Sequence, residues 1–390
     1  SIVNKLGKRM IGWDESLDGE IRPSATVMSW RGTEGGIRAA KAGHDVIMTP
    51  LQHVYFDFYQ GSSVDEPMAI HGLTRLSDVY AFNPLPAELS VEEQAHILGA
   101  QGNLWTEYVR TPADAERMVL PRMSALAEVL WSAESQQDFA SFSDRLPAFE
   151  SLLVELGYQP ARSHYKPHLV FRENAAGGFE VRLESLAGDL RYRVNDADTA
   201  AYTGPFTVQD SATIHAFSVL PNGERLGDAR LTLVDHLARN AVIRPFDTSV
   251  DWKPGQGRVL VDGQLATDRI FRYPEWYSAG PQGMDLVIEL SGEAPVSSVS
   301  VGWQAGYHRK LFRPTALEVQ VPEAGGQWRA VARLDAKQMN ELTGNRLELR
   351  FTPTSTQQLR VIASNDQLHW SEEQSKNVPP TLRVDEIVVQ

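Results

Sequence analysis

Cysteine is absent from all 390 residues, which excludes disulfide bridges, thiolate nucleophiles and Cys-ligated zinc. No apolar run approaches the length needed to span a bilayer, so the sequence predicts no membrane span. Positive charge is also scarce: 37 Lys and Arg stand against 50 Asp and Glu, which leaves a formal net charge of −13. Such a chain is a poor match for nucleic acid and suits a neutral or weakly charged ligand.

The N-terminus lacks the features of an export signal. Ser1-Ile2-Val3-Asn4-Lys5 has neither an apolar segment nor a cleavage site and is typical of the tail of a helix. We therefore expect the chain to begin inside a domain. An apolar content of 42% and a charged content of 22% are ordinary for globular proteins, and 390 residues predict two or three domains.

The first third of the chain alternates short apolar runs with helical patterns, which predicts βα units and a parallel sheet. The expected strands are Arg9–Trp13, Thr26–Trp30, Asp45–Thr49 and Ile97–Leu104. Thr33 and Gly43 are the expected ends of a helix, and Thr111-Pro112 is the expected start of another. Pro121 is expected to divide the helical stretch from Met118 to Trp131, and a last amphipathic helix stops at Gly157.

Four parallel strands cannot close a barrel, and half a barrel exposes an edge and its core. The sequence leaves two alternatives: the other half lies upstream and is missing here, or two copies pair. The abrupt start of the chain favours the first.

From about Leu169 the pattern changes to strand-like alternation separated by turn residues. Regularly spaced short strands predict a small β-sandwich to roughly Val242. A second all-β block follows Arg244-Pro245. Its expected strands are Asp285–Leu290, Val296–Val301, Leu317–Val321, Leu347–Phe351 and Leu359–Ile362.

Aromatic and acidic residues gather at the ends of the expected parallel strands. They are Trp13 with Asp14 and Glu15, Trp30 with Arg31, Tyr55 with Asp57, and Trp105 with Glu107. The carboxyl ends of the strands form the active-site face of a parallel α/β barrel. A single Trp at such a position is more often a core plug, but all of these residues together favour a lined pocket.

Five segments resemble, in the family's order, motifs of the family 20 glycoside hydrolases, the β-N-acetylhexosaminidases. They are Arg9–Glu15, Val27–Gly32, Tyr55–Asp57, Gly102–Glu107 and Pro121–Ser132. The resemblance covers residues 1 to about 160 and implies the second half of a catalytic (β/α)8 barrel.

The resemblance also implies roles for individual residues. In this family the substrate's own 2-acetamido group is the nucleophile, which makes it an exception to the two-carboxylate scheme. Trp13, Trp30 and Trp105 would wall the acetamido pocket, and Trp105 would also pack against the sugar face. Tyr55, the expected catalytic residue, would donate a hydrogen bond to the acetamido oxygen, and Asp57 and Glu107 would accept hydrogen bonds from sugar hydroxyls.

The chain departs from the family at the acid pair. The family's His-x-Gly-Gly-Asp-Glu motif, which supplies the Asp that orients the acetamido nitrogen and the Glu that is the general acid/base, does not occur in the sequence. Asp14-Glu15, Asp65-Glu66 and Asp385-Glu386 are Asp-Glu pairs, but none follows Gly-Gly. Glu15 could replace the acid, although an ion-paired or hydrogen-bonded structural role is favoured. We therefore expect this polypeptide alone to be inactive and to require the N-terminal half of the barrel for a complete site.

The later blocks carry weaker resemblances. Residues near 168–242 are similar to the small β-sandwich of bacterial chitobiases, and the last block resembles a discoidin-like (F5/8 type C) jelly roll. Trp252, Tyr273, Trp276, Trp303 and Tyr307 are candidates for glycan contacts there, or for core packing. The expected domains are 1–165 (half barrel), 166–244 (β-sandwich) and 245–390 (jelly roll), an α/β plus all-β fold class.

The leading interpretation is thus a fragment of a bacterial exo-acting enzyme that removes terminal β-linked GlcNAc or GalNAc from a glycan. A non-catalytic glycan-binding protein that acts through its C-terminal jelly roll is the competing interpretation. A third is another glycosidase on the same barrel with its acid supplied by a partner chain. No histidine shows metal-ligand spacing, and no cofactor is predicted. The glycan-degrading role of the family implies a periplasmic or secreted location.

Overall fold

The computed structural model describes residues 2–19, 21–61, 66–174, 177–250, 252, 255–266, 276–279, 283–304, 312–341, 343–365, 369–371, 376–378 and 381–390. The chain divides into two compact units. Unit 1 comprises Ser1–His168, Glu184–Arg191 and Phe217–Ala229. Unit 2 comprises Leu169–Leu183, Tyr192–Ala216 and Arg230–Gln390.

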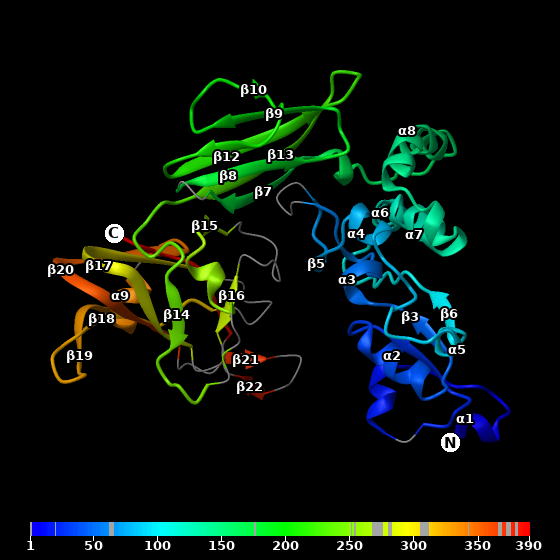
Figure 1. The fold of residues 1–390 in the computed structure, drawn as a ribbon, viewed down its shortest axis with the longest axis horizontal. Coiled ribbons are helices and arrows are strands. Elements are labelled where there is room, and N and C mark those ends of the chain that lie inside the picture. Colours follow the sequence, from blue (N-terminus) through cyan, green and yellow to red (C-terminus); the bar gives the residue numbers. More distant parts are fainter. Residues whose placement is uncertain are drawn as a thin grey trace. The chain divides into compact units, whose positions relative to one another are not determined.

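A four-stranded parallel sheet in the order β1-β2-β3-β6 forms the centre of unit 1. Its strands are β1 (Ile11–Trp13), β2 (Thr26–Ser29), β3 (Val46–Met48) and β6 (Ile97–Ala100). Val27, Val46 and Met48 are fully buried, as expected for parallel strands covered on both faces. Because the strands run in one direction, their carboxyl ends meet at one edge of the sheet. Figure 1 labels β3 and β6 of this sheet and the helix α2 near them.

Short helices surround this sheet. They are α1 (Ile2–Lys5), η1 (Asp14–Asp18), α2 (Glu34–Lys41), α3 (Leu51–Val54), α4 (Leu76–Tyr80), α5 (Val91–Gln94), α6 (Pro112–Val119), α7 (Arg122–Trp131), η3 (Glu134–Gln136), α8 (Phe139–Glu155) and η4 (Ser163–Tyr165). The N-terminus of α6 is fixed by a capping box, in which the Thr111 side chain accepts from the Asp114 backbone N–H and the Asp114 carboxylate accepts from that of Thr111. Ala125 and Leu126 of α7 and Phe142 of α8 join the same apolar core as the sheet.

The next part of the chain forms two antiparallel layers of strands. A five-stranded sheet has the order β10-β9-β12-β13-β15, and a three-stranded sheet has the order β11-β8-β7. The strands are β7 (His168–Glu173), β8 (Phe179–Glu184), β9 (Asp189–Val194), β10 (Ala200–Ala201), β11 (Phe206–Val208), β12 (Ala212–Val219), β13 (Arg225–Leu233) and β15 (Gln264–Leu265). Alternate residues of β12 are buried, which is the pattern of a sheet with one covered face.

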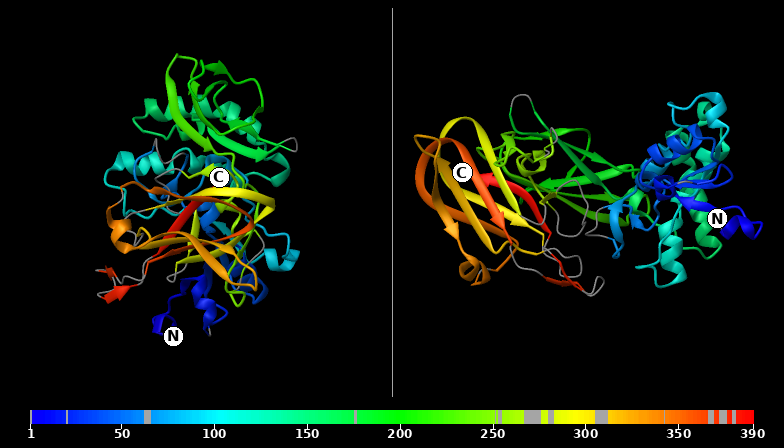
Figure 2. Two further views of the ribbon diagram at one scale, coloured as in Figure 1. Left: turned by 90° about the vertical axis from the view of Figure 1, so that its left-hand side faces the viewer. Right: turned by 90° about the horizontal axis from the view of Figure 1, so that it is seen from below.

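The C-terminal part of unit 2 is a seven-stranded sheet in the order β16-β23-β17-β20-β18-β19, with β14 paired to β17. Figure 2 shows its long strands β17 (yellow), β20 (orange) and β23 (red) side by side. The elements of this part are β14 (Val242–Pro245), η5 (Arg258–Leu260), β16 (Tyr277–Ala279), β17 (Met284–Trp303), β18 (Ala316–Pro322), β19 (Trp328–Leu334), α9 (Ala336–Glu341), β20 (Arg346–Ser364) and β23 (Leu382–Val389). The short strands β21 (His369–Ser371) and β22 (Lys376–Val378) pair with each other.

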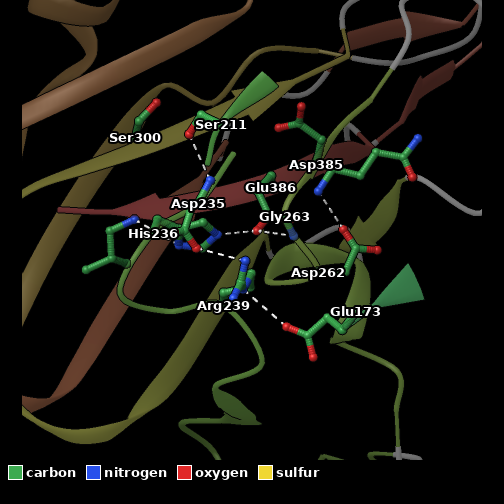
Figure 3. A network of polar contacts seen from close by, with 12 residues as sticks. Glu173, Ser211, Asp235, His236, Arg239, Asp262, Gly263, Ser300, Asp385 and Glu386 are labelled. Carbon is green, nitrogen blue, oxygen red and sulfur yellow. Dashed lines mark hydrogen bonds and ion pairs between the residues drawn. The ribbon is translucent and has the colours of Figure 1, made fainter. Parts of the chain in front are cut away.

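A buried polar cluster lies within unit 2, between the segment after β13 and the last strand (Figure 3). The Glu386 carboxyl group contacts His236 Nε2 at 2.6 Å and accepts the Gly263 backbone N–H at 3.0 Å. His236 Nδ1 accepts the Val389 backbone N–H at 3.4 Å, so the neutral tautomer with its proton on Nε2 fits both contacts. Asp262 shares a further hydrogen bond with Glu386.

The structure confirms the four expected parallel strands, although each is shorter than predicted because backbone pairing does not extend over the whole expected range. The division at Pro121 and the helix start at Pro112 are also confirmed. Thr33 precedes α2, but its side chain accepts no capping hydrogen bond. In the C-terminal block, four of the expected strands merge into two. The strands expected at 285–290 and 296–301 form β17, and those expected at 347–351 and 359–362 form β20, each with an irregular register between its two halves.

The coarse organisation, an α/β segment followed by β structure, agrees with the sequence prediction. The domain boundaries and the assignments as a β-sandwich and a discoidin-like jelly roll stay predictions. Among the helices in the described ranges, none has the length and apolarity to cross a membrane.

Candidate functional site

The predicted site residues lie at the carboxyl edge of the parallel sheet. Trp13 is the last residue of β1, and Trp30 directly follows β2. Tyr55 follows the short helix α3 and pairs as an isolated parallel bridge with Asn103, in the segment after β6. Trp105 lies two residues further along that segment. The bridge thus brings the segment after α3 and the segment after β6 together at the carboxyl edge of the sheet.

The four aromatic rings form a connected row. The Trp13 and Trp105 ring centroids are 6.0 Å apart at an interplanar angle of 41°, and those of Trp30 and Tyr55 are 6.4 Å apart at 34°. The Trp105 side chain hydrogen-bonds that of Tyr55, which joins the two pairs. Trp105 keeps 45% of its surface exposed, so the row offers an accessible flat apolar face.

The Tyr55 hydroxyl is held in its protonated form. Burial raises the pKa of this phenol, and the carboxylates of Asp57, Asp14 and Glu15 add to the effect. An indole N–H can only donate a hydrogen bond, so in the bond with Trp105 the Tyr55 oxygen is the acceptor. The Tyr55 proton therefore stays available for donation to another acceptor.

Asp57 is a buried carboxyl group with unmet hydrogen-bonding capacity. It is 3% exposed, and its Oδ1 has no hydrogen-bond partner within the described part of the chain. Burial raises the pKa of Asp57 to about 6; the Arg122 guanidinium opposes this rise, and the Glu107 carboxylate adds to it. Glu107 is itself exposed. A buried polar atom without a partner is costly, and a ligand hydroxyl would relieve that cost.

Arg122 of α7 anchors the loop that carries Tyr55 and Asp57. Its side chain is fully buried and donates to the backbone carbonyls of Phe56 at 2.5 Å, Phe58 at 3.2 Å and Thr74 at 2.9 Å. Its guanidinium also lies 5.1 Å from the centroid of the Phe56 ring. These contacts fix the backbone on both sides of Asp57.

The Asp-Glu pairs of the sequence have different surroundings. Asp14, 1% exposed, accepts hydrogen bonds from Arg31, and both Glu15 oxygens lie 3.0 Å from Trp30 Nε1. Asp385 and Glu386 lie in unit 2, in the buried cluster described above. Asp65 lies outside the described residues. The ranges that the structure describes contain no group of three or more His, Asp or Glu side chains suited to hold a metal ion.

Two of the C-terminal aromatic candidates belong to the core. Trp303 is 2% exposed and Trp276 is 9% exposed, so neither offers a face to a glycan. Trp252 is half-buried, with its ring 6.0 Å from that of Tyr277. Tyr273 and Tyr307 lie outside the described residues.

The structure thus places all six predicted residues at one edge of the sheet and connects four of them directly. Arg122 was not predicted from the sequence, because three of its acceptors, the carbonyls of Phe56, Phe58 and Thr74, are distant in the sequence. No local pattern signals such contacts, although an arginine inside a largely apolar helix was an available hint.

Residues 1–134 match the family described as "Glycosyl hydrolase family 20, catalytic domain". A β-hexosaminidase of Porphyromonas gingivalis is 51% identical over 146 residues, which cover 37% of this chain and 19% of that protein. A β-hexosaminidase of Vibrio furnissii is 35% identical over 133 residues, which cover 32% of this chain and 21% of that protein. The resemblance of the N-terminal segment to glycosyl hydrolase family 20, found in its motifs, is therefore confirmed.

The solved structures that the chain resembles include an exo-β-N-acetylglucosaminidase of Vibrio harveyi in complex with N-acetylglucosamine. It is 30% identical, with a TM-score of 0.38 over 41% of this chain and 26% of that one. The chain spans about a fifth of the length of the two curated relatives named above.

Proposed function

We propose that this chain carries the acetamido-binding half of an exo-β-N-acetylhexosaminidase site. The observation that carries the proposal is the row of four aromatic rings beside the buried Asp57 carboxyl, in a segment of family 20. The relatives of that segment are named β-hexosaminidases, which supports a glycoside hydrolase as the parent enzyme. The substrate is a glycan that ends in β-linked GlcNAc or GalNAc.

The side chains divide the binding of the sugar among them. Trp13, Trp30 and Trp105 enclose the acetamido methyl group and the C–H face of the ring, which are apolar surfaces that suit indole. Tyr55 donates a hydrogen bond to the acetamido carbonyl oxygen. Its hydroxyl proton is free for this bond because the indole N–H of Trp105 donates to the Tyr55 oxygen and does not use the proton. Asp57 and Glu107 accept hydrogen bonds from sugar hydroxyls.

The reaction is substrate-assisted and retaining. The acetamido oxygen attacks the anomeric carbon while the glycosidic bond breaks, and the leaving oxygen takes a proton from a general acid. Water then opens the resulting oxazolinium ring and restores the acetamido group. Tyr55 stabilises the carbonyl oxygen as the ring forms because a fixed donor there needs no reorganisation during the step.

The general acid and the residue that orients the acetamido nitrogen are contributed from outside these 390 residues, because the His-x-Gly-Gly-Asp-Glu motif does not occur in the sequence. The N-terminal half of a (β/α)8 barrel is the source we propose. This chain by itself binds the sugar and does not hydrolyse it.

Two measurements on the purified chain test the proposal. N-Acetylglucosamine should produce a saturable change in tryptophan fluorescence, and Trp105→Ala should abolish that change. p-Nitrophenyl N-acetylglucosaminide should release no p-nitrophenol. Metal-independent hydrolysis by the chain alone would show that an acid within it was misassigned.

A matched variant separates this proposal from glycan binding by the C-terminal block. Trp252→Ala removes the half-buried indole of that block and leaves the parallel sheet untouched. Binding that survives Trp105→Ala and is lost in Trp252→Ala would favour the non-catalytic alternative.

A further inference from the structure

We propose that Glu15 is a positioning residue that holds the indole of Trp30 in the orientation the acetamido pocket requires. The proposal rests on the proposed function of this site. It gives the second acid of the Asp14-Glu15 pair a defined task, different from proton transfer.

The contact is direct and links neighbouring strands. Glu15 lies in η1, immediately after β1, and Trp30 immediately follows β2. Both carboxylate oxygens of Glu15 lie 3.0 Å from Trp30 Nε1. An indole has one N–H, so this proton is shared between two oxygens of one charged acceptor, the stronger class of hydrogen bond.

The residues next to this pair are also paired with each other. Asp14 Oδ1 accepts from Arg31 Nε at 2.8 Å, and its Oδ2 accepts from the Arg31 backbone N–H at 3.3 Å. Asp14 therefore fixes the backbone just after Trp30, and Glu15 fixes the ring of Trp30 itself. Two consecutive carboxylates after strand β1 thus define both the position and the tilt of the indole that follows strand β2.

The tilt matters because Trp30 and Tyr55 are neighbours. Their ring centroids are 6.4 Å apart at 34°, so a rotation of the indole would change the space beside the Tyr55 hydroxyl. A methyl-sized group such as the acetamido methyl tolerates little change in the walls that enclose it. Loss of the Glu15 bond should therefore weaken sugar binding through the changed position of the Trp30 ring.

The same bond makes Glu15 a poor proton donor. The hydrogen bond from Trp30 is the largest cause of the lowered pKa of Glu15, and the Arg31 charge adds to it. An ionised carboxylate whose oxygens both face one N–H has no proton to deliver to a leaving group. This assignment removes the Asp14-Glu15 pair as a substitute for the absent acid motif.

Four variants of the full chain test the proposal: Glu15→Ala, Glu15→Gln, Trp30→Phe and the double variant Glu15→Ala/Trp30→Phe. Asp18→Ala is the matched control, because it removes an exposed carboxylate from the same η1 segment. The affinity for N-acetylglucosamine is measured by calorimetry for each protein. In parallel, the indole N–H resonance of Trp30 is followed by NMR as a function of pH and assigned through its loss in Trp30→Phe.

Glu15→Ala should weaken binding about tenfold, the factor for loss of one hydrogen bond to a charged group. Glu15→Gln, which keeps an acceptor oxygen, should restore most of the affinity, and Asp18→Ala should change it less than about twofold. Phenylalanine has no N–H, so Glu15→Ala should cost nothing further in the Trp30→Phe background. An equal loss in both backgrounds would overturn the proposal.

The NMR measurement decides the proposal even if the sugar does not bind. Absence of sugar binding by the unmodified chain contradicts the proposed function. The Trp30 resonance then still reports whether Glu15 holds the indole: it should titrate with an acidic group in the unmodified chain and in Asp18→Ala, and lose that titration in Glu15→Ala. A resonance that is unchanged by Glu15→Ala would exclude the positioning role.

Discussion

At the scale of single residues, Asp57 combines deep burial with an oxygen that lacks a partner in the described structure. Few side chains are as costly to leave in that state, because an ionised carboxyl loses its hydration on burial. Burial raises its pKa to about 6, so at neutral pH the group is ionised at the expense of stability. A loss of stability from a buried ionised group is typical of binding sites, where a ligand can supply the missing hydrogen bond.

The sign of the resulting pH dependence follows from the raised pKa. The folded Asp57 binds its proton more tightly than an unfolded Asp, so its contribution to stability is present below about pH 4 and is lost as the pH rises through about 6. We expect Asp57→Asn to be more stable than the unmodified chain at pH 8, by at most about 3 kcal/mol. The difference should shrink toward zero near pH 4. Urea unfolding of both proteins between pH 4 and pH 8 measures it.

Asp144→Asn serves as the control for that series, because Asp144 is exposed on α8. It should change the unfolding free energy little at any pH. A gain from Asp57→Asn that does not vary with pH would contradict the assignment of the effect to ionisation.

At the scale of elements, α7 holds the site loop through one side chain. Arg122 reaches the carbonyls of Phe56, Phe58 and Thr74, so one guanidinium ties helix α7 to the segments around the paired strands β4 (Phe58–Tyr59) and β5 (Ile70–Leu73). In this contact one buried cation donates to several carbonyl oxygens. Such an arrangement depends more strictly on geometry than an apolar contact of equal size, because each donor must face its acceptor.

Arg122→Met should destabilise unit 1 by about 3–5 kcal/mol, because it leaves several buried carbonyls without a donor. Arg145→Met is the matched control: Arg145 pairs with Glu128 at 2.8 Å on the surface, and its loss should cost less than about 1 kcal/mol. Chemical denaturation followed by tryptophan fluorescence distinguishes the two. A cost below 1 kcal/mol for Arg122→Met would refute the anchoring role.

The elements also show what the sequence could predict. The four parallel strands were predictable because short apolar runs end at turn residues, and the strand-end positions of Trp13 and Trp30 followed from them. The hydrogen bonds from Arg122 to the site loop were not predictable, since these acceptors are backbone carbonyls 48 to 66 residues away in the sequence. The long strand β17 was predicted as two strands, Asp285–Leu290 and Val296–Val301, whereas the structure joins them in one strand with an irregular register after Glu289.

At the scale of the whole molecule, unit 2 holds a cluster of buried titratable groups around one histidine. The cluster of unit 2 places His236, Asp262 and Glu386 together (Figure 3). Burial raises the pKa of Asp262 to about 7 and that of Glu386 to about 9, and it lowers the pKa of His236 to about 4. All three groups are therefore held toward their neutral forms.

This cluster predicts a loss of stability in unit 2 under alkaline conditions. A carboxyl group with a raised pKa stabilises the fold at low pH and loses that effect as the pH rises through its folded value. Between pH 7 and 9 the loss should come mainly from Glu386, at up to about 1.4 kcal/mol per pH unit. Glu386→Gln keeps an acceptor for His236 and should flatten the dependence. Calorimetric unfolding across this range measures it.

Asp235→Asn, which removes a neighbouring carboxylate that pairs with Arg239 at 2.8 Å, should retain the alkaline loss. An unchanged slope in Glu386→Gln would assign the effect to another group.

The contact between Trp13 and Trp105 joins the end of one outer strand of the parallel sheet to the segment after the other, across 92 positions of the sequence. Closing a contact over so long a stretch of chain costs conformational entropy before the contact contributes any stability. We therefore expect the row of four aromatic rings to be completed late in the refolding of unit 1. A sugar that binds there would recognise only the finished sheet and would stabilise it as a whole.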